Sequence, residues 1–215
     1  MRSYVRPDIH LQEFFDVSGS TINYGERWGM HSPPEHTYSV TSNLQRFAPL
    51  HEVADAMIVH LDETYDVVVA SDPAFATDLA RARDDVIRVV RVSPNTSDAS
   101  PLTFVFTSFP SVIVRAGVFQ ELLYPTCGCD ACDEEWVRTA DELEWQVFAV
   151  VAGGLEEHIN SGAALEVAMS LAAQDGSRSV SGQSMRADFP AEQMASAERR
   201  LATLPGAWER WPLRG

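Results

Sequence analysis

Apolar residues recur at helical spacing in two long stretches of the chain. The first covers residues 49–65 and the second covers residues 133–152. In both, apolar positions follow one another three and four residues apart, which places them on one face of an α-helix. Pro49 suits the first turn of the first helix, and acidic residues 133–135 suit the positive N-terminal end of the second. The pattern therefore predicts two long amphipathic helices.

Between these helices the pattern becomes that of β-strands. Runs rich in Val, Ile, Phe and Thr occupy residues 86–92, 102–109 and 112–119, and these residue types favour strands. The connections between the runs are short, so consecutive strands should pair antiparallel. A short helix over residues 72–83 precedes them.

The C-terminal part predicts a hairpin, a helix and a tail. Residues 164–172 and 179–189 flank Asp175-Gly176, a pair typical of hairpin turns. A last helix begins at Pro190. Trp208 and Trp211 follow it, and we expect both indoles to pack against the body of the protein because exposed tryptophans are unusual.

Strands in one block, flanked by helices, predict an α+β fold: a mainly antiparallel sheet packed against two long amphipathic helices, with a C-terminal hairpin and helix. We expect a single α+β domain over residues 1–215. Its parts are a loop-rich N-terminal segment (1–46), a helix-sheet-helix core (47–154), and a hairpin, helix and Trp-rich tail (155–215). Residues 25–46 show only turn chemistry, and the sequence assigns them no role.

Charge and composition exclude several functions. The chain has 31 acidic and 16 basic residues, a formal net charge of −15, and every basic residue is Arg. Without Lys there is no Schiff-base, pyridoxal-phosphate or phosphate-loop lysine chemistry. The negative charge opposes binding to nucleic acid and to anionic membranes, and it makes a basic protein the favoured partner class.

The compartment that the sequence predicts is the cytoplasm. No apolar run has the roughly 18 residues of a membrane helix, and no secretory signal follows the first residues. The three cysteines lie within six residues, which is a poor basis for a disulfide framework and fits a reducing environment.

Those three cysteines form the strongest chemical signal. Cys127, Cys129 and Cys132 can converge on a soft cation such as Zn²⁺. The first two lie closer in sequence than the usual zinc-knuckle spacing, and no second cysteine pair exists. No spacing selects a fourth ligand among the remaining candidates, which are His31, His36, His60, His158, Asp130 and Asp133.

Two other interpretations of the cysteines stay open. Cys129 and Cys132 form a CxxC ahead of a predicted helix, where the helix dipole lowers a thiol pKa and favours redox chemistry. The nearby acidic residues, from Asp130 to Glu135, should disfavour a thiolate and attract a cation. Alternatively, the thiols are reduced, bind nothing and close a turn.

Three further groups are explained without chemistry. His51, Glu52 and Asp55 outline a metalloprotease-like helix, but all three should lie on the solvated face. His31 and His36 should be loop residues that make local hydrogen bonds. The densest basic group should form surface ion pairs rather than a phosphate site; it consists of Arg81, Arg83, Arg88 and Arg91.

Several blocks resemble a family of uncharacterised actinobacterial proteins, a domain of unknown function. The blocks are RPDIHLQEF (6–14), RFAPLHEVADAMIVHL (46–61), PLTFVFTSFP (101–110), CGCDACDE (127–134), VVAGG (150–154) and the ending from Leu204 to Pro212. The resemblance implies a cytoplasmic protein with no assigned activity, whose cysteine block is a family feature. It implies no catalytic role for any residue.

The function expected from the sequence is therefore that of a binding or interaction module with a candidate structural metal site at Cys127, Cys129 and Cys132. The alternative is a zinc-dependent hydrolase in which the same cysteines hold the metal and Glu134 acts as the base. Whether the protein is an enzyme stays open. Zinc is the cofactor that this donor set favours.

Overall fold

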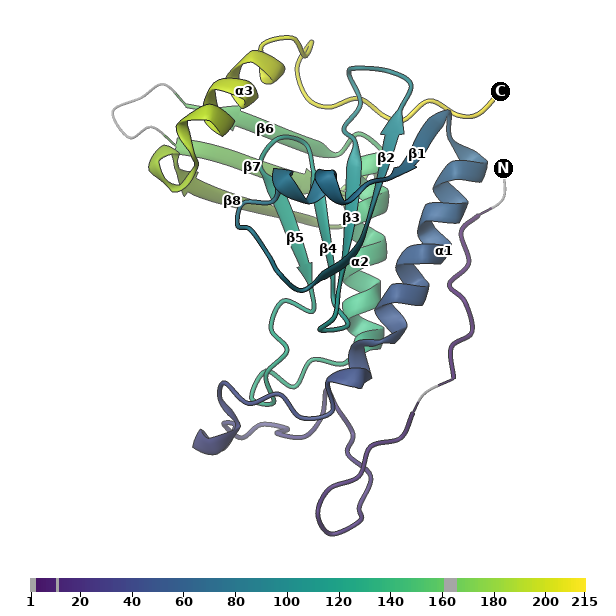
Figure 1. The fold of residues 1–215 in the computed structure, drawn as a ribbon, viewed down its shortest axis with the longest axis vertical. Helices are drawn as coiled ribbons and strands as arrows, with labels where there is room; N and C mark the ends of the chain where they lie inside the picture. The colour runs from purple at the N-terminus through teal and green to yellow at the C-terminus, as the bar shows by residue number, and fades with distance from the viewer. Residues whose placement is uncertain (1–2, 11, 161–165) are drawn as a thin grey trace.

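The computed structural model describes residues 3–10, 12–160 and 166–215 and combines helices with two antiparallel sheets (Figure 1). The expected α+β class is thereby confirmed. A sheet of five strands and a sheet of three strands replace the one main sheet that the sequence suggested.

The larger sheet is a meander in which each strand pairs antiparallel with the next along the chain. Its strands are β1 (Val67–Ser71), β2 (Val86–Pro94), β3 (Leu102–Thr107), β4 (Val112–Ala116) and β5 (Gln120–Tyr124). The expected third strand over 112–119 is in fact shorter, because the chain turns at Gly117 and returns as β5.

Helices α1 (Pro49–Thr64) and α2 (Trp136–Val151) cover one face of this sheet (Figure 1). Between them and the strands lies the main core, in which Phe104 and Phe106 of β3 are fully buried. The sequence predicts that residues 133–135 form the first turn of α2, but the helix begins only at Trp136. Asp133 has a φ of 53°, which ends the preceding loop before the helix begins.

The opposite face of the sheet carries a smaller apolar cluster. Val105 alternates with the two phenylalanines along β3, so it points to this side and is also fully buried. Phe75 and Leu79 cover it. The expected helix over 72–83 is only the 3₁₀ segment η3 (Pro73–Asp78). It does not continue, because the amide of Ala80 donates to the Glu121 carboxylate at 2.9 Å instead of to a carbonyl of the preceding turn.

The second sheet contains β6 (Leu155–Ile159), β7 (Glu166–Ala172) and β8 (Ser179–Met185), with helix α3 (Ala191–Leu201) packed against it (Figure 1). Strands β7 and β8 form the hairpin that the sequence predicts. Its expected residues 164 and 165 lie outside the described part. Strand β6 was not expected from the sequence.

A buried carboxylate joins the two sheets. Glu157 of β6 is 5% exposed. It accepts hydrogen bonds from the amides of Val118 (2.9 Å), Phe119 (2.7 Å) and Gln120 (3.2 Å) in the β4–β5 turn. The indole of Trp208 donates to it at 2.8 Å. We call these contacts the Glu157 junction.

The C-terminal tail lies along the core as expected. Trp208 and Trp211 are 2% and 1% exposed. The Trp211 indole donates to the carbonyl of Ser100 at 2.8 Å, and Leu213 forms a β-bridge with Tyr65.

The N-terminal segment has little regular structure. It contains an isolated bridge between Phe15 and Thr21 in place of a full hairpin, and two single 3₁₀ turns, η1 (Glu35–Thr37) and η2 (Leu44–Phe47). Its first described residues run alongside α1, and the later part, together with the connection between β5 and α2, extends beyond one end of the sheet, at the bottom of Figure 1.

None of the helices in the described part of the chain has the length and apolar character needed to cross a membrane.

Candidate metal centre

The connection between β5 and α2, residues 125–135, brings the three cysteines together; we call it the cysteine loop. The three Sγ atoms lie within 4.8 Å of one another, and those of Cys127 and Cys129 are 3.3 Å apart. Cys127 and Cys129 are half-buried and Cys132 is exposed. All three are free thiols.

This geometry fits a tetrahedral metal. Sulfur ligands about 2.3 Å from one Zn²⁺ lie about 3.8 Å from each other, close to the separations seen here. Among the residues that the structure describes, the cluster contains the three cysteines and no His, Asp or Glu. Three soft donors are thus in place, and the fourth position is not filled by any of the candidate residues.

The two aspartates of the loop are engaged elsewhere. Asp130, 5% exposed, accepts from the Ser42 amide at 3.1 Å and faces Arg46 and Arg27 at 3.6 and 3.8 Å. Asp133 forms an ion pair with Arg27 and also accepts from its backbone amide, at 2.8 Å. They hold the loop to the N-terminal segment and do not surround a cation, contrary to the expectation from sequence.

Arg46 is the central residue of this attachment. It is 4% exposed and donates to the carbonyls of Gly128 (2.8 Å) and Ser42. Its guanidinium lies 4.3 Å from the ring centre of Tyr24. A guanidinium can serve several carbonyl oxygens at once while it stacks on an aromatic ring, and Arg46 does both.

Backbone contacts complete the attachment. The amide of Asp130 donates to Val40 at 2.7 Å, the amide of Ala131 donates to Thr37 at 3.1 Å, and the Trp28 indole donates to the Asp130 carbonyl at 3.2 Å. We call residues 24–47 the arginine clamp, since Arg27 and Arg46 are its main contacts. The clamp gives a role to the segment that the sequence left unassigned.

Glu134, the candidate base, is also occupied. Its carboxylate accepts from the amides of Cys127 (2.6 Å) and Thr126 (3.0 Å). Burial raises its pKa. It closes the loop around the cysteines rather than facing a reacting group.

The thiols differ in their protonation. The backbone amide of Cys132, followed by the Cys127 thiol, lowers the pKa of Cys129 to about 7. Hydrogen bonds with Cys127 and Cys129 raise the pKa of Cys132 to about 12. The sequence predicts that acidic neighbours disfavour a thiolate. This does not hold for Cys129, because its closest polar neighbours are N–H and S–H groups.

None of the four candidate histidines joins the cluster in the described structure. His60 packs against Tyr4 and Phe148 in a cluster of three rings. His158 is exposed on β6, beside Glu156. His31 and His36 are exposed in the N-terminal segment.

The other candidate groups have structural explanations. His51 is half-buried and not solvated as expected: its Nε2 lies 3.0 Å from the Ser111 carbonyl and its ring contacts Phe106 edge-on. Asp55 pairs with Arg88. Three of the four residues of the basic group form ion pairs, as predicted: Arg83 with Asp85, Arg88 with Asp55 and Arg91 with Asp78. Within the described part of the chain, Arg81 forms none.

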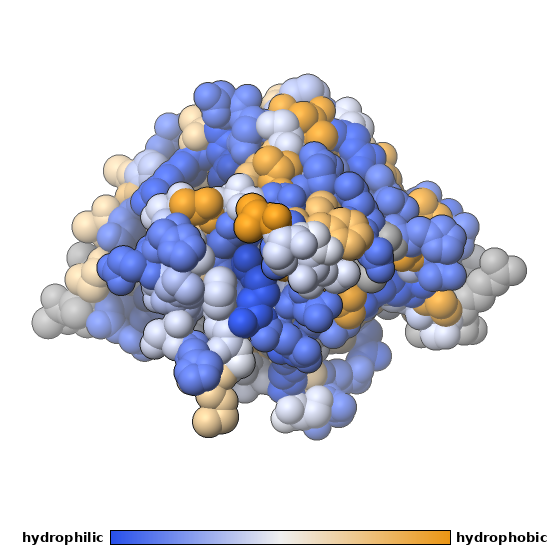
Figure 2. Space-filling model, turned by 90° about the horizontal axis from the view of Figure 1, so that it is seen from below, coloured by the Kyte–Doolittle hydropathy of each residue, from blue (hydrophilic) through white to orange (hydrophobic). Residues whose placement is uncertain are grey.

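The end of the molecule that carries the clamp and the cysteine loop is mostly hydrophilic, with separate apolar spots and no continuous apolar face (Figure 2). Sequence reasoning missed the clamp. The signal that could have found it is Arg46, a charged residue directly before the buried Phe47 and the start of α1.

The chain matches one protein family, a family of unknown function named DUF6226, over residues 10–215. Neither a curated protein nor a solved structure matches it. The expectation of a family without assigned function is thereby confirmed. On this match, which covers almost the whole sequence, the chain belongs to the family of unknown function DUF6226.

Proposed function

We propose that this protein is a binding module in which Cys127, Cys129 and Cys132 hold a structural metal ion, with zinc as the metal. The observation that carries the proposal is the convergence of three sulfur atoms within 4.8 Å on one loop. Thiolates are the preferred ligands of structural zinc, and such sites stabilise short loops that lack regular structure.

The surroundings favour a structural role over a catalytic one. Asp130, Asp133 and Glu134 all accept hydrogen bonds from protein N–H groups, so each of these carboxylates already serves to hold the loop in place. The arginine clamp fixes the loop from outside, in the way that second-shell contacts orient metal ligands. A reducing compartment such as the cytoplasm would keep the thiols available.

A basic protein is the partner class that we propose for the module. The net charge is −15. In the described part of the chain ten arginines already form ion pairs with carboxylates. The excess of acidic groups therefore sets the surface field, which accelerates the approach of cationic partners.

Elemental analysis tests the metal site. Protein purified without chelator should contain close to one zinc per chain. Cys129→Ser should lose the zinc and melt at a lower temperature, because metal binding stabilises the folded state. His158→Ala removes an exposed metal-binding side chain outside the cluster and should keep the zinc. A wild-type protein without metal would overturn the proposal.

A zinc-dependent hydrolase is the second candidate, favoured by one observation. A pocket of about 410 Å³ lies beside the loop and is lined by Cys132, Asp133 and Glu134. Zinc-loaded protein should then hydrolyse p-nitrophenyl acetate faster than its Glu134→Gln variant. Equal rates in the two proteins would exclude Glu134 as a base and leave the structural role.

A further inference from the structure

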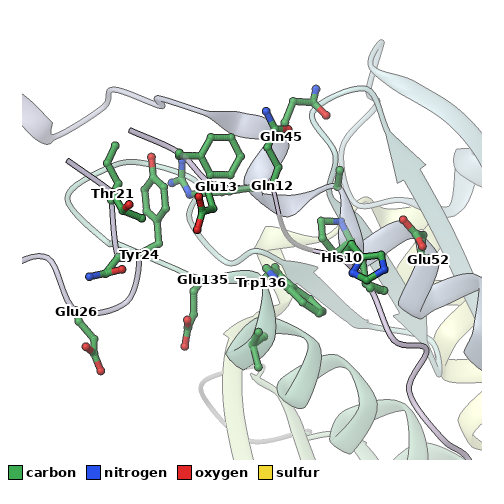
Figure 3. Close-up of a pocket in the computed structure, with 18 residues that line it drawn as sticks. His10, Gln12, Glu13, Thr21, Tyr24, Glu26, Gln45, Glu52, Glu135 and Trp136 are labelled. Atoms are coloured by element: carbon green, nitrogen blue, oxygen red, sulfur yellow. The ribbon is translucent and has the colours of Figure 1, made fainter. Parts of the chain in front are cut away.

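Outside the cysteine loop, a pocket of about 650 Å³ lies beside the arginine clamp (Figure 3). Residues 9, 10, 12–14, 21–24 and 26 form one side of it, and the first turns of α1 and α2 form the other. Its volume lies within the range of small-ligand sites. No cysteine lines it.

Four carboxylates line this pocket, and three of them have no counter-ion. Glu13, Glu26 and Glu52 are exposed, and within the part of the chain that the structure describes none of them forms an ion pair. Glu135 pairs with Arg138 at 2.9 Å. They project from separate segments around the cavity (Figure 3). A negative potential focused in a cavity of this kind attracts cations.

Aromatic rings supply the rest of the recognition surface. Phe14, Tyr24 and Trp136 line the same pocket and are half-buried. Arg27 and Arg46 already lie over the Tyr24 ring, at 4.4 and 4.3 Å from its centre, so Phe14 and Trp136 are the rings left for a ligand. Ring faces attract ammonium and guanidinium groups, more strongly where water is partly excluded. The indole Nε1 of Trp136 is buried and has no hydrogen-bond partner among the described residues. Because this nitrogen is closed off from solvent, a ligand can contact the ring of Trp136 but not its N–H group.

One cation of the protein itself lines the pocket, but its bonding capacity is already used. Arg46 donates to the carbonyls of Ser42 and Gly128, faces Asp130 and stacks on Tyr24. It does not neutralise the three exposed glutamates. The lining of the pocket therefore combines a net negative charge with aromatic rings.

We propose that this pocket binds an organic cation, a guanidinium or alkylammonium group. The cation is either a small molecule or an arginine or lysine side chain of a basic protein. The inference rests on the binding role proposed above and gives that role a ligand class. It does not depend on the metal.

Titration calorimetry at low salt with N-acetylargininamide tests it, since this probe carries one guanidinium group. We expect saturable binding to the wild-type protein. The neutral isostere N-acetylcitrullinamide should bind at least about tenfold more weakly, because it lacks the charge that the glutamates and rings recognise. A tetra-arginine peptide tests the protein-borne form of the same group.

Matched variants separate the pocket from net charge. The triple variant Glu13→Gln, Glu26→Gln, Glu52→Gln should weaken binding by about tenfold or more. The control triple variant Glu63→Gln, Glu192→Gln, Glu209→Gln removes the same three charges from exposed sites outside the pocket and should change binding less than about twofold.

Binding of N-acetylargininamide supports a free small cation, and binding of the peptide alone supports a side chain of a basic protein. If neither probe binds, or if both triple variants weaken binding equally, the proposal is wrong. Cys129→Ser should bind the probe like the wild type. A missing metal and a missing cation site are therefore separate results.

Discussion

The cysteine loop and the Glu157 junction both tie a turn to a distant part of the chain, but they do so with opposite chemistry. In the junction one buried carboxylate receives four N–H groups, and no reactive side chain is left over. In the cysteine loop, ion pairs and hydrogen bonds between arginines and aspartates hold the backbone in place. The three thiols lie together, and no His, Asp or Glu of the described structure joins their cluster.

This comparison distinguishes contacts that only stabilise the fold from contacts that also hold reactive groups in place. Every polar atom of the junction is used to join β6, the β4–β5 turn and the tail. The clamp holds its loop in the same way, yet the result is a cluster of soft donors at a half-exposed surface. A loop fixed by so many contacts, with its reactive groups kept together, is typical of a preorganised binding site.

The largest predicted effect breaks the junction. Glu157→Gln should lower the free energy of unfolding by about 3 kcal/mol, because the new amide group would face two N–H donors in a buried site. Urea unfolding measures it. Glu156→Gln, at an exposed neighbour, is the matched control and should have almost no effect. Similar losses in both variants would show that the junction stabilises nothing.

The next prediction concerns the clamp. Arg46→Lys keeps the charge but cannot serve the carbonyls of Ser42 and Gly128 while it stacks on Tyr24, so unfolding should become easier by about 2 kcal/mol. Zinc affinity should fall by about tenfold, because Arg46 holds the backbone that positions Cys127 and Cys129. Competition with a chromophoric chelator measures the affinity.

Arg88→Lys is the control for that variant, since Arg88 forms an exposed ion pair with Asp55 and its replacement should cost under about 1 kcal/mol. If Arg46→Lys loses stability but binds zinc like the wild type, the clamp serves the fold alone and the contrast between the two regions disappears.

The smallest expected effect is the pH dependence of the junction. Burial raises the pKa of Glu157 in the folded state. Between the unfolded pKa and this raised value the folded protein binds more protons than the unfolded chain, so the contribution of Glu157 to stability decreases as the pH rises.

The stability difference between wild type and Glu157→Gln should therefore be largest at and below the unfolded pKa, about 4.3 for a glutamate, and should shrink as the pH rises through the raised folded pKa. Urea unfolding of both proteins across this range measures it, and other titrating groups cancel in the difference. A gap that widens with pH would mean that the four donors outweigh burial.

Local patterns were sufficient to predict much of the fold. The range 49–65 coincides closely with α1, the run 102–109 contains β3, and Asp175-Gly176 joins β7 and β8. In each case the signal lies within the element itself, as helical spacing, β-branched residues or turn chemistry. The convergence of the three thiols also follows from their nearness in sequence.

What the sequence did not reveal depends on contacts between distant residues. The chain turns after β4 at Gly117, where φ is 57°, and only glycine fits because a Cβ atom there would overlap the carboxylate of Glu157, forty positions away. From their sequence position beside the thiols, Asp130 and Asp133 could belong to a cation site. In the structure they instead form ion pairs with Arg27 and Arg46 of the N-terminal segment. No local pattern contains the identity of such a partner.

The C-terminal tail has a consequence for the order of folding. Trp208 supplies one of the four donors to Glu157, Trp211 caps the loop before β3, and Leu213 pairs beside the end of α1. These contacts join residues more than 50 positions apart, and contacts of that separation form slowly. The core thus reaches its final packing only after residues 208–213 have left the ribosome and docked, so these contacts form last in the course of folding.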